Sequence, residues 1–199
     1  MKKEKALVWF RRDLRDHDHA ALSAALAGAQ QVYCAFIFDS EILDVLPGRR
    51  DRRVHFIRES LVELDAALRA KGGGMIVRHG RAAKEISSLA KELGVSAVFA
   101  NRDYEPAAKQ RDALVADLLV EAFNKGGVVP GYEQKGFGGR PIELAYVDEA
   151  GGPTKVVTEY RNLVSRQNVD MVIGVISSGD CLAVAPVAEE MKKLTVLFD

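Results

Sequence analysis

Charged side chains follow several short apolar runs of the sequence, at the places where α/β proteins commonly bind ligands. The apolar runs are typical of strands buried in a parallel sheet. In an open sheet of this kind, ligands bind beyond the carboxyl ends of the strands. The four residues in this position are Arg11, Asp39, Asp103 and Glu105. We therefore take them as candidate ligand-binding residues, with a helix N-cap as the alternative role for Asp103.

A second candidate site is the helix predicted to begin after the apolar run 170–176. Its first residues are Ser177, Ser178 and Gly179. Free backbone N–H groups and the positive end of a helix attract an anion, and a hydroxyl group stands beside them. The simpler interpretation is that Ser177 is an ordinary N-cap.

Other residues with the right chemistry lack the right spacing. His17 and His19 would point to different faces of a helix, which favours a solvated loop over a metal site. The segment 11–13 (RRD) occupies the place of a glycine-rich phosphate loop, so a dinucleotide site of the usual type is not expected. A cluster of arginines without interleaved aromatic residues is interpreted as the approach to a helix, not as a phosphate contact: Arg49, Arg50, Arg52 and Arg53. We find no nucleophile–base pair, metal cluster or phosphate loop, and therefore expect no enzymatic activity.

The composition is that of a soluble globular protein, with 48% hydrophobic and 28% charged residues among 199. It contains no 18-residue apolar run and no signal-peptide pattern, so we expect a cytoplasmic protein without a membrane partner. Cys34 and Cys181 lie far apart in no metal-binding spacing and are interpreted as reduced thiols.

Strands alternate with helices along the chain, which predicts an α/β fold. We expect a doubly wound, mainly parallel sheet of Rossmann-like or flavodoxin-like type, with helices on both faces and about seven strands. The predicted strands are 6–10, 31–38, 75–77, 96–100, 141–147, 170–176 and 194–198. The segment 104–125 is predicted to be one long amphipathic helix, because Pro106 stands in its first turn and Gly126 follows its end.

Four segments of the first 119 residues resemble the amino-terminal α/β domain of the DNA photolyase/cryptochrome family. They are LVWFRRDLRDHDHAAL, FIFDSEIL, RRVHFIRESLVELDAALRAKG and VFANRDYEP. The resemblance implies a light-harvesting antenna pigment at the carboxyl ends of the strands, where Arg11, Asp39, Asp103 and Glu105 match the site. It departs from the family after the His-Asp pair, because His19 and Ala20 stand where the family usually has Asn-Pro. The catalytic flavin of the family is held by a large helical domain, so the length of this chain leads us to expect no light-driven DNA repair.

Residues 120–199 resemble a different family, the first lobe of periplasmic substrate-binding proteins of ABC transporters for amino acids or aromatic compounds. The resemblance rests on VEAFNKGGV and on the stretch from GGRPIELAYV to LTVLFD. It implies that Ser177, Ser178 and Gly179 help to hold the carboxylate of a ligand.

The two resemblances together predict an engineered chimera, an artificial or de novo designed protein with a single fused α/β domain. Its seam would lie within the helix 104–125. We expect no catalytic activity, no cofactor and no nucleic-acid partner. A displaced edge strand at 141–147 would favour a homodimer. The alternatives are a binding module with a weak site for an antenna pigment, flavin or nucleotide, or weak carboxylate binding at 177–179.

Overall fold

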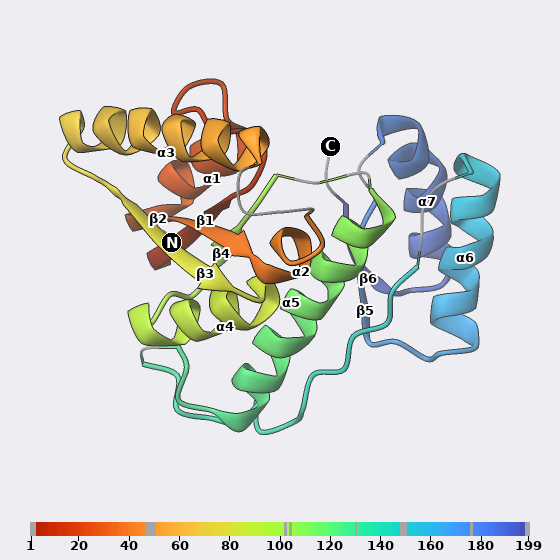
Figure 1. Ribbon diagram of the computed structural model, residues 1–199. Coiled ribbons are helices and arrows are strands. Elements are labelled where there is room, and N and C mark those ends of the chain that lie inside the picture. The colour runs from red at the N-terminus through yellow and green to blue at the C-terminus, as the bar shows by residue number, and fades with distance from the viewer. Residues whose placement is uncertain are drawn as a thin grey trace. The chain divides into compact units, whose positions relative to one another are not determined.

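The computed structural model describes residues 3–46, 51–101, 103, 105–129, 131–147, 151–175 and 177–197, without the side chain of Lys3. The chain divides into two compact units, Met1–Ile142 and Glu143–Asp199. Figure 1 shows their helices and strands, and each unit is described by itself.

The first unit is built on a four-stranded parallel sheet with the strand order β3-β2-β1-β4. The strands are β1 (Lys3–Phe10), β2 (Ala29–Asp39), β3 (Met75–Gly80) and β4 (Val98–Phe99). Strand β1 lies in the middle of the sheet, and its apolar run from Ala6 to Phe10 is buried on both faces. This burial explains why the run is continuous instead of alternating. Strand β4 pairs with β1 in parallel, on the side away from β2.

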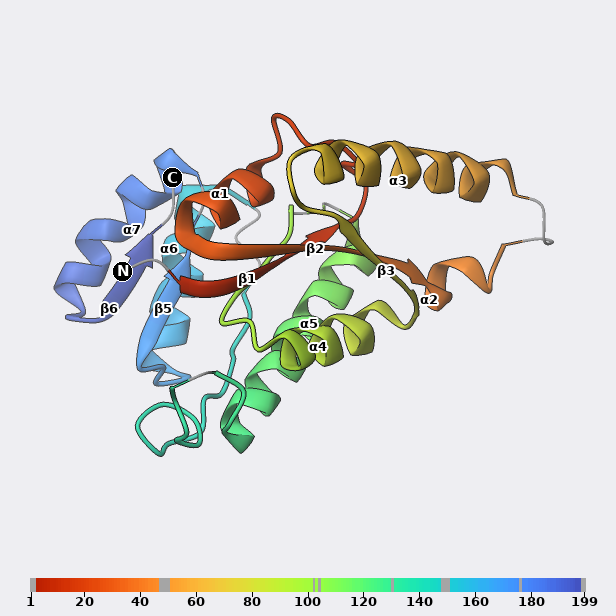
Figure 2. The same ribbon diagram turned by 90° about the vertical axis from the view of Figure 1, so that its left-hand side faces the viewer.

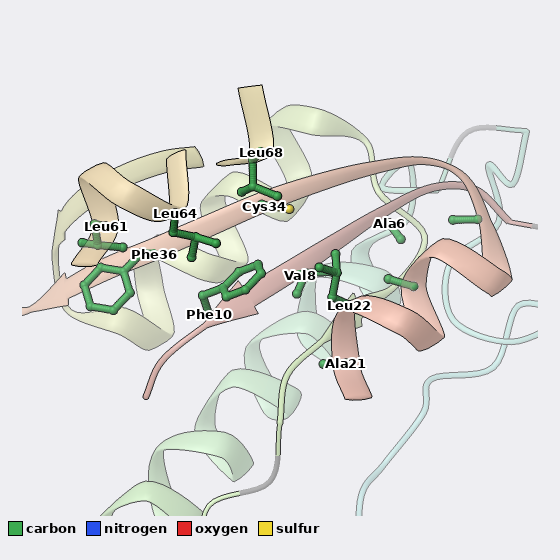
Figure 3. Packing of buried hydrophobic residues seen from close by; sticks show 12 residues of the cluster. Ala6, Val8, Phe10, Ala21, Leu22, Cys34, Phe36, Leu61, Leu64 and Leu68 are labelled. Atoms are coloured by element: carbon green, nitrogen blue, oxygen red, sulfur yellow. The ribbon is translucent and has the colours of Figure 1, made fainter. Parts of the chain in front are cut away.

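Helices cover both faces of this sheet, as predicted (Figure 2). Helices α1 (Ala20–Gly28) and α3 (Arg52–Ala70) lie on one face, and α4 (Ala82–Leu93) and α5 (Pro106–Lys125) lie on the other. On the first face, alternate residues of β1 from Ala6 to Phe10 belong to one apolar cluster with residues of α1 and three leucines of α3, and Figure 3 shows Phe10 beside Leu64. On the opposite face, Leu7 and Trp9 belong to a cluster with Ile86, Leu89 and Val115.

Helix α5 runs without interruption across the predicted seam, so the prediction of one long helix is confirmed. Its carboxyl end is tied to the chain that follows. The side-chain amide of Asn124 donates to the carbonyl oxygen of Ile142 (2.8 Å), and its oxygen accepts from the Ile142 amide (2.7 Å). In the loop between Asn124 and Ile142, the ring of Tyr132 stacks on Phe123 of α5, and the Tyr132 hydroxyl donates to the Gly136 carbonyl. The first unit therefore ends at Ile142, well beyond residue 119.

The second unit contains helices α6 (Pro153–Ser165) and α7 (Ser178–Glu190) and a separate parallel sheet of two strands. These strands are β5 (Met171–Gly174) and β6 (Leu194–Leu197). A small apolar cluster joins the helices to the sheet: Val156, Tyr160, Val172, Val184 and Val187. The Tyr160 hydroxyl is hydrogen-bonded to Thr195 (2.6 Å), which satisfies a buried polar group.

The described residues form six strands in two sheets, so the expectation of about seven strands in one sheet is wrong. The predicted strand 141–147 is irregular and pairs with no strand of the described chain. The expectation of a homodimer was based on this edge strand, and the described chain does not form it. The short helix α2 (Ser40–Leu43) was not predicted. A single fused domain stays a prediction.

Candidate ligand-binding site at the carboxyl ends of the strands

Arg11 follows β1 and points its charge toward the start of α5. Its guanidinium group pairs with the Asp112 carboxylate and donates to the backbone carbonyl oxygen of Asn101, which lies just beyond β4. The same group lies 4.9 Å from the centre of the Trp9 ring, within the range of a cation–π contact. Arg11 thus connects β1 with the segments that follow β4.

Asp39 ends β2 and is buried. Its Oδ1 accepts hydrogen bonds from the backbone amides of Glu41 (3.1 Å), in α2, and Ala82 (3.3 Å), the first residue of α4. Its Oδ2 lies 3.0 Å from Nε of Arg111 in α5. The distance is that of an ion pair, although Oδ2 accepts no hydrogen bond with good geometry from Arg111 or from any other described group.

Asp103 and Glu105 follow β4 and bind the same arginine. Nε of Arg12 lies 3.0 Å from Oδ2 of Asp103, and its Nη2 lies 2.7 Å from Oε2 of Glu105. Oδ1 of Asp103 also accepts from the Glu105 amide (3.2 Å). The hydrogen bond that Arg12 donates to Glu105, aided by the charge of Asp103, raises the pKa of Arg12. Glu105 itself, and not Asp103, is the N-cap residue of α5.

The first turns of α5 contribute two residues that sequence reasoning missed, Arg111 and Asp112. They pair with Asp39 and Arg11 respectively, so neighbouring helix residues of opposite charge contact the ends of neighbouring strands. Burial raises the pKa of Asp112, and the charge of Arg11 opposes this shift. The sequence could have indicated them, because both residues lie three or four positions from the buried Ala108 and Val115 and so share their face of the helix. Charged residues on a buried helix face indicate partners across the interface.

Asn101 and His19 complete the polar cluster. The Asn101 side chain accepts from the Ala21 amide (2.9 Å), donates to Asp13 (2.9 Å), and has its Nδ2 3.3 Å from Nε2 of His19. His19 is buried and caps α1, since its Nδ1 accepts from the Leu22 amide (3.1 Å). Burial lowers its pKa. The prediction of a solvated loop is therefore correct for His17, whose side chain is exposed, but wrong for His19, which is buried.

Ser177, Ser178 and Gly179 belong to the second unit, whereas the polar cluster belongs to the first. Ser177 is the N-cap of α7, but its side chain makes no capping hydrogen bond. The first turn of α7 also holds Asp180, which is buried and whose Oδ1 has no hydrogen-bond partner. A carboxylate at the positive end of the helix repels an anionic ligand. Carboxylate binding at this helix start stays a prediction, and Asp180 opposes it.

The remaining candidates offer no site. Within the described parts of the chain, no three His, Cys, Asp or Glu side chains gather as metal ligands. Arg49 and Arg50 lie outside the described residues, while Arg52 and Arg53 begin α3. Both cysteines are free, and burial raises the pKa of Cys34 to about 11. None of the described helices is both long and apolar enough to span a bilayer.

The fold and the cluster define a parallel α/β domain with a polar site at the carboxyl ends of β1, β2 and β4. The family model described as DNA photolyase matches residues 6–168. The chain therefore belongs to the DNA photolyase family.

Individual relatives agree with this assignment. The deoxyribodipyrimidine photo-lyase of Halobacterium salinarum is 34% identical over 163 residues, covering 77% of this chain and 32% of that protein. Cryptochrome DASH of Natronomonas pharaonis is 35% identical over 123 residues, 60% of this chain and 26% of the relative. The crystal structure of an archaeal photolyase from Sulfolobus tokodaii superposes with a TM-score of 0.54 at 35% identity, covering 59% of this chain and 27% of that one. The chain thus spans less than a third of the length of each of these relatives.

These similarities correct the prediction of an engineered chimera. The family match runs through the proposed seam to residue 168, and the relatives are natural proteins. The assignment of residues 120–199 to a periplasmic substrate-binding protein receives no support. The expectation of no enzymatic activity is contradicted as well, because deoxyribodipyrimidine photo-lyases are among the relatives. The physical reason is that βα units of unrelated α/β proteins share the same local pattern of apolar runs and helix caps.

Proposed function

We propose that the first unit is a chromophore-binding domain, which takes a planar light-absorbing cofactor such as a flavin at the carboxyl ends of β1, β2 and β4. The observation that carries the proposal is Oδ2 of Asp39, which faces Arg111 in an ion pair but accepts no well-aligned hydrogen bond. It is a buried acceptor at the sheet edge where open parallel sheets bind ligands. The related Sulfolobus photolyase is described as containing two FAD molecules, with the implication of a novel light-harvesting cofactor.

The residues of the cluster suit such a ligand. A flavin ring carries an N–H group that could donate a hydrogen bond to the Asp39 carboxylate. The carbonyl oxygens of the ring could accept hydrogen bonds from arginine or asparagine side chains. When bound, the cofactor would absorb light and pass on the excitation. The chain's own contribution is to hold the ring, and the contacts of Asp39 with the starts of α2 and α4 keep that carboxylate in place.

At the level of the whole protein, we propose a role in light-dependent DNA repair or photoreception. The support is the names of the relatives, which include deoxyribodipyrimidine photo-lyases and cryptochromes. In this proposal the first unit collects light for that activity.

Trp9 makes the proposal directly testable, because it is the one tryptophan of the chain and lies beside Arg11. The purified protein is examined for a co-purifying blue-absorbing chromophore and then titrated with riboflavin while Trp9 emission is recorded. We expect saturable quenching. Asp39→Asn should weaken binding about tenfold, since it removes a charged acceptor. Asp44→Asn, an exposed carboxylate five residues away, serves as the control and should bind normally. A colourless protein with no saturable response to riboflavin, FMN or FAD would refute the proposal.

A further inference from the structure

Each arginine of the cluster is already neutralised by a carboxylate of the chain. Arg11 pairs with Asp112, Arg111 pairs with Asp39, and Arg12 is held between two acidic residues. Two of these pairs connect α5 to the strand ends and have largely buried arginine side chains. Of the described residues in this cluster, none offers a cation that is left for a ligand anion.

Acidic groups are in excess in the same cluster. The described charged side chains that join it are three arginines (Arg11, Arg12 and Arg111) and five carboxylates (Asp13, Asp39, Asp103, Glu105 and Asp112). An incoming phosphate would have to take an arginine from its carboxylate. That exchange would leave a partly buried carboxylate without a partner, which is unfavourable. A neutral group with N–H or O–H donors meets no such penalty and finds acceptors in place.

Asp112 is the residue that decides the charge preference at the centre of the cluster. It binds Arg11 directly and also interacts electrostatically with Arg111 and Asp103. It lies on helix α5, next in sequence to Arg111. Replacing its charge by a neutral amide would release the Arg11 guanidinium while retaining an acceptor of the same shape.

We infer that this site binds the uncharged, donor-bearing ring of its cofactor and excludes anionic groups, with Asp112 as the residue that sets this specificity. The inference rests on the proposed function, since it concerns the same site. Any phosphate of the cofactor is therefore held outside the cluster of Arg11, Arg111 and Asp39.

The test compares riboflavin with FMN, which differ by one phosphate group. Dissociation constants for both are measured on the full chain through Trp9 emission, at low and at moderate salt. Riboflavin should bind at least as tightly as FMN. At low salt FMN should be weaker by up to about tenfold, and this gap should shrink as salt screens the acidic groups. Tighter binding of FMN by tenfold or more would overturn the inference but leave the proposed function standing. If neither compound binds, the proposed function itself fails.

The Asp112→Asn variant tests the role of that residue. The freed Arg11 should raise the affinity for FMN relative to riboflavin by about tenfold, the size of one charge-assisted contact. Glu121→Gln changes the same charge on the same helix, at an exposed residue that pairs with Lys125, and should leave the ratio unchanged. An unchanged ratio in Asp112→Asn would remove Asp112 from the specificity. Should that variant not fold, the wild-type ratio still decides the inference.

Discussion

Arg111 of α5 and Asp39 of β2 form a 3.0 Å ion pair whose side chains are only 15% and 5% exposed. The two residues stand 72 positions apart in the sequence, one at a strand end and the other on a helix face. Asp39 also caps α2 and accepts from the first residue of α4. One carboxylate thus holds three helices at the edge of the sheet where the ligand is proposed to bind.

Removing the cation of this pair should destabilise the first unit strongly. Arg111→Met leaves a buried carboxylate unpaired, and we expect a loss of about 3–5 kcal/mol in the free energy of unfolding. Urea unfolding followed by Trp9 emission measures it. The double variant Asp39→Asn/Arg111→Met should recover part of this loss, because no buried charge remains. Glu121→Gln removes an exposed pair and should cost at most about 0.5 kcal/mol. Equal losses in Arg111→Met and Glu121→Gln would contradict the buried character of the pair.

His19 should make stability depend on pH near neutrality. Burial lowers its pKa in the folded protein below the ordinary value of 6.5, so the unfolded chain binds a proton more readily. The stabilisation is therefore complete above pH 6.5 and is lost as the pH falls from there toward the folded-state pKa. The slope is at most about 1.4 kcal/mol per pH unit.

The variant His19→Asn isolates this effect. Asparagine keeps a capping acceptor for α1 but does not titrate. Urea unfolding between about pH 5 and 8 should show a shallower dependence than the wild type. Parallel curves for the two proteins would show that another group causes the dependence.

Gly136 and Gly138 provide a matched pair of substitutions, because both have φ of +59°. A Cβ at Gly136 would lie 1.9 Å from the Arg140 carbonyl oxygen, whereas a Cβ at Gly138 meets nothing within 4 Å. Gly138→Ala should therefore cost only the backbone strain, about 1 kcal/mol. Gly136→Ala should open the turn and abolish hydrogen-exchange protection of the Phe137 and Arg140 amides, which bond to each other's carbonyls. Equal protection in both variants would refute the close contact.

The first unit should fold without the second. A fragment ending at Ile142 keeps the four-stranded sheet, its four long helices and the bonds between Asn124 and Ile142. We expect cooperative urea unfolding with the same Trp9 emission as the full chain. Loss of cooperativity in the fragment would instead favour the single fused domain predicted from the sequence.

Local patterns were sufficient for most of the elements. The apolar runs of β1, β2 and β3 and the proline and glycine that bound α5 predicted these elements in the right order. The reason is that strand and helix periodicity are properties of neighbouring residues. The same local character misled the chimera prediction, since βα units of different families satisfy the same patterns.

By itself, the sequence determined the α/β class, the helices on both sheet faces, the photolyase-type motifs and the positions of Arg11 and Asp39 at strand ends. Only the tertiary structure decided that Arg111 and Asp112 complete the cluster and that His19 is buried. It also decided that 141–147 forms no strand and that β5 and β6 form a sheet of their own. These features depend on contacts between residues far apart in the sequence, and local sequence patterns do not specify which distant residue a side chain contacts.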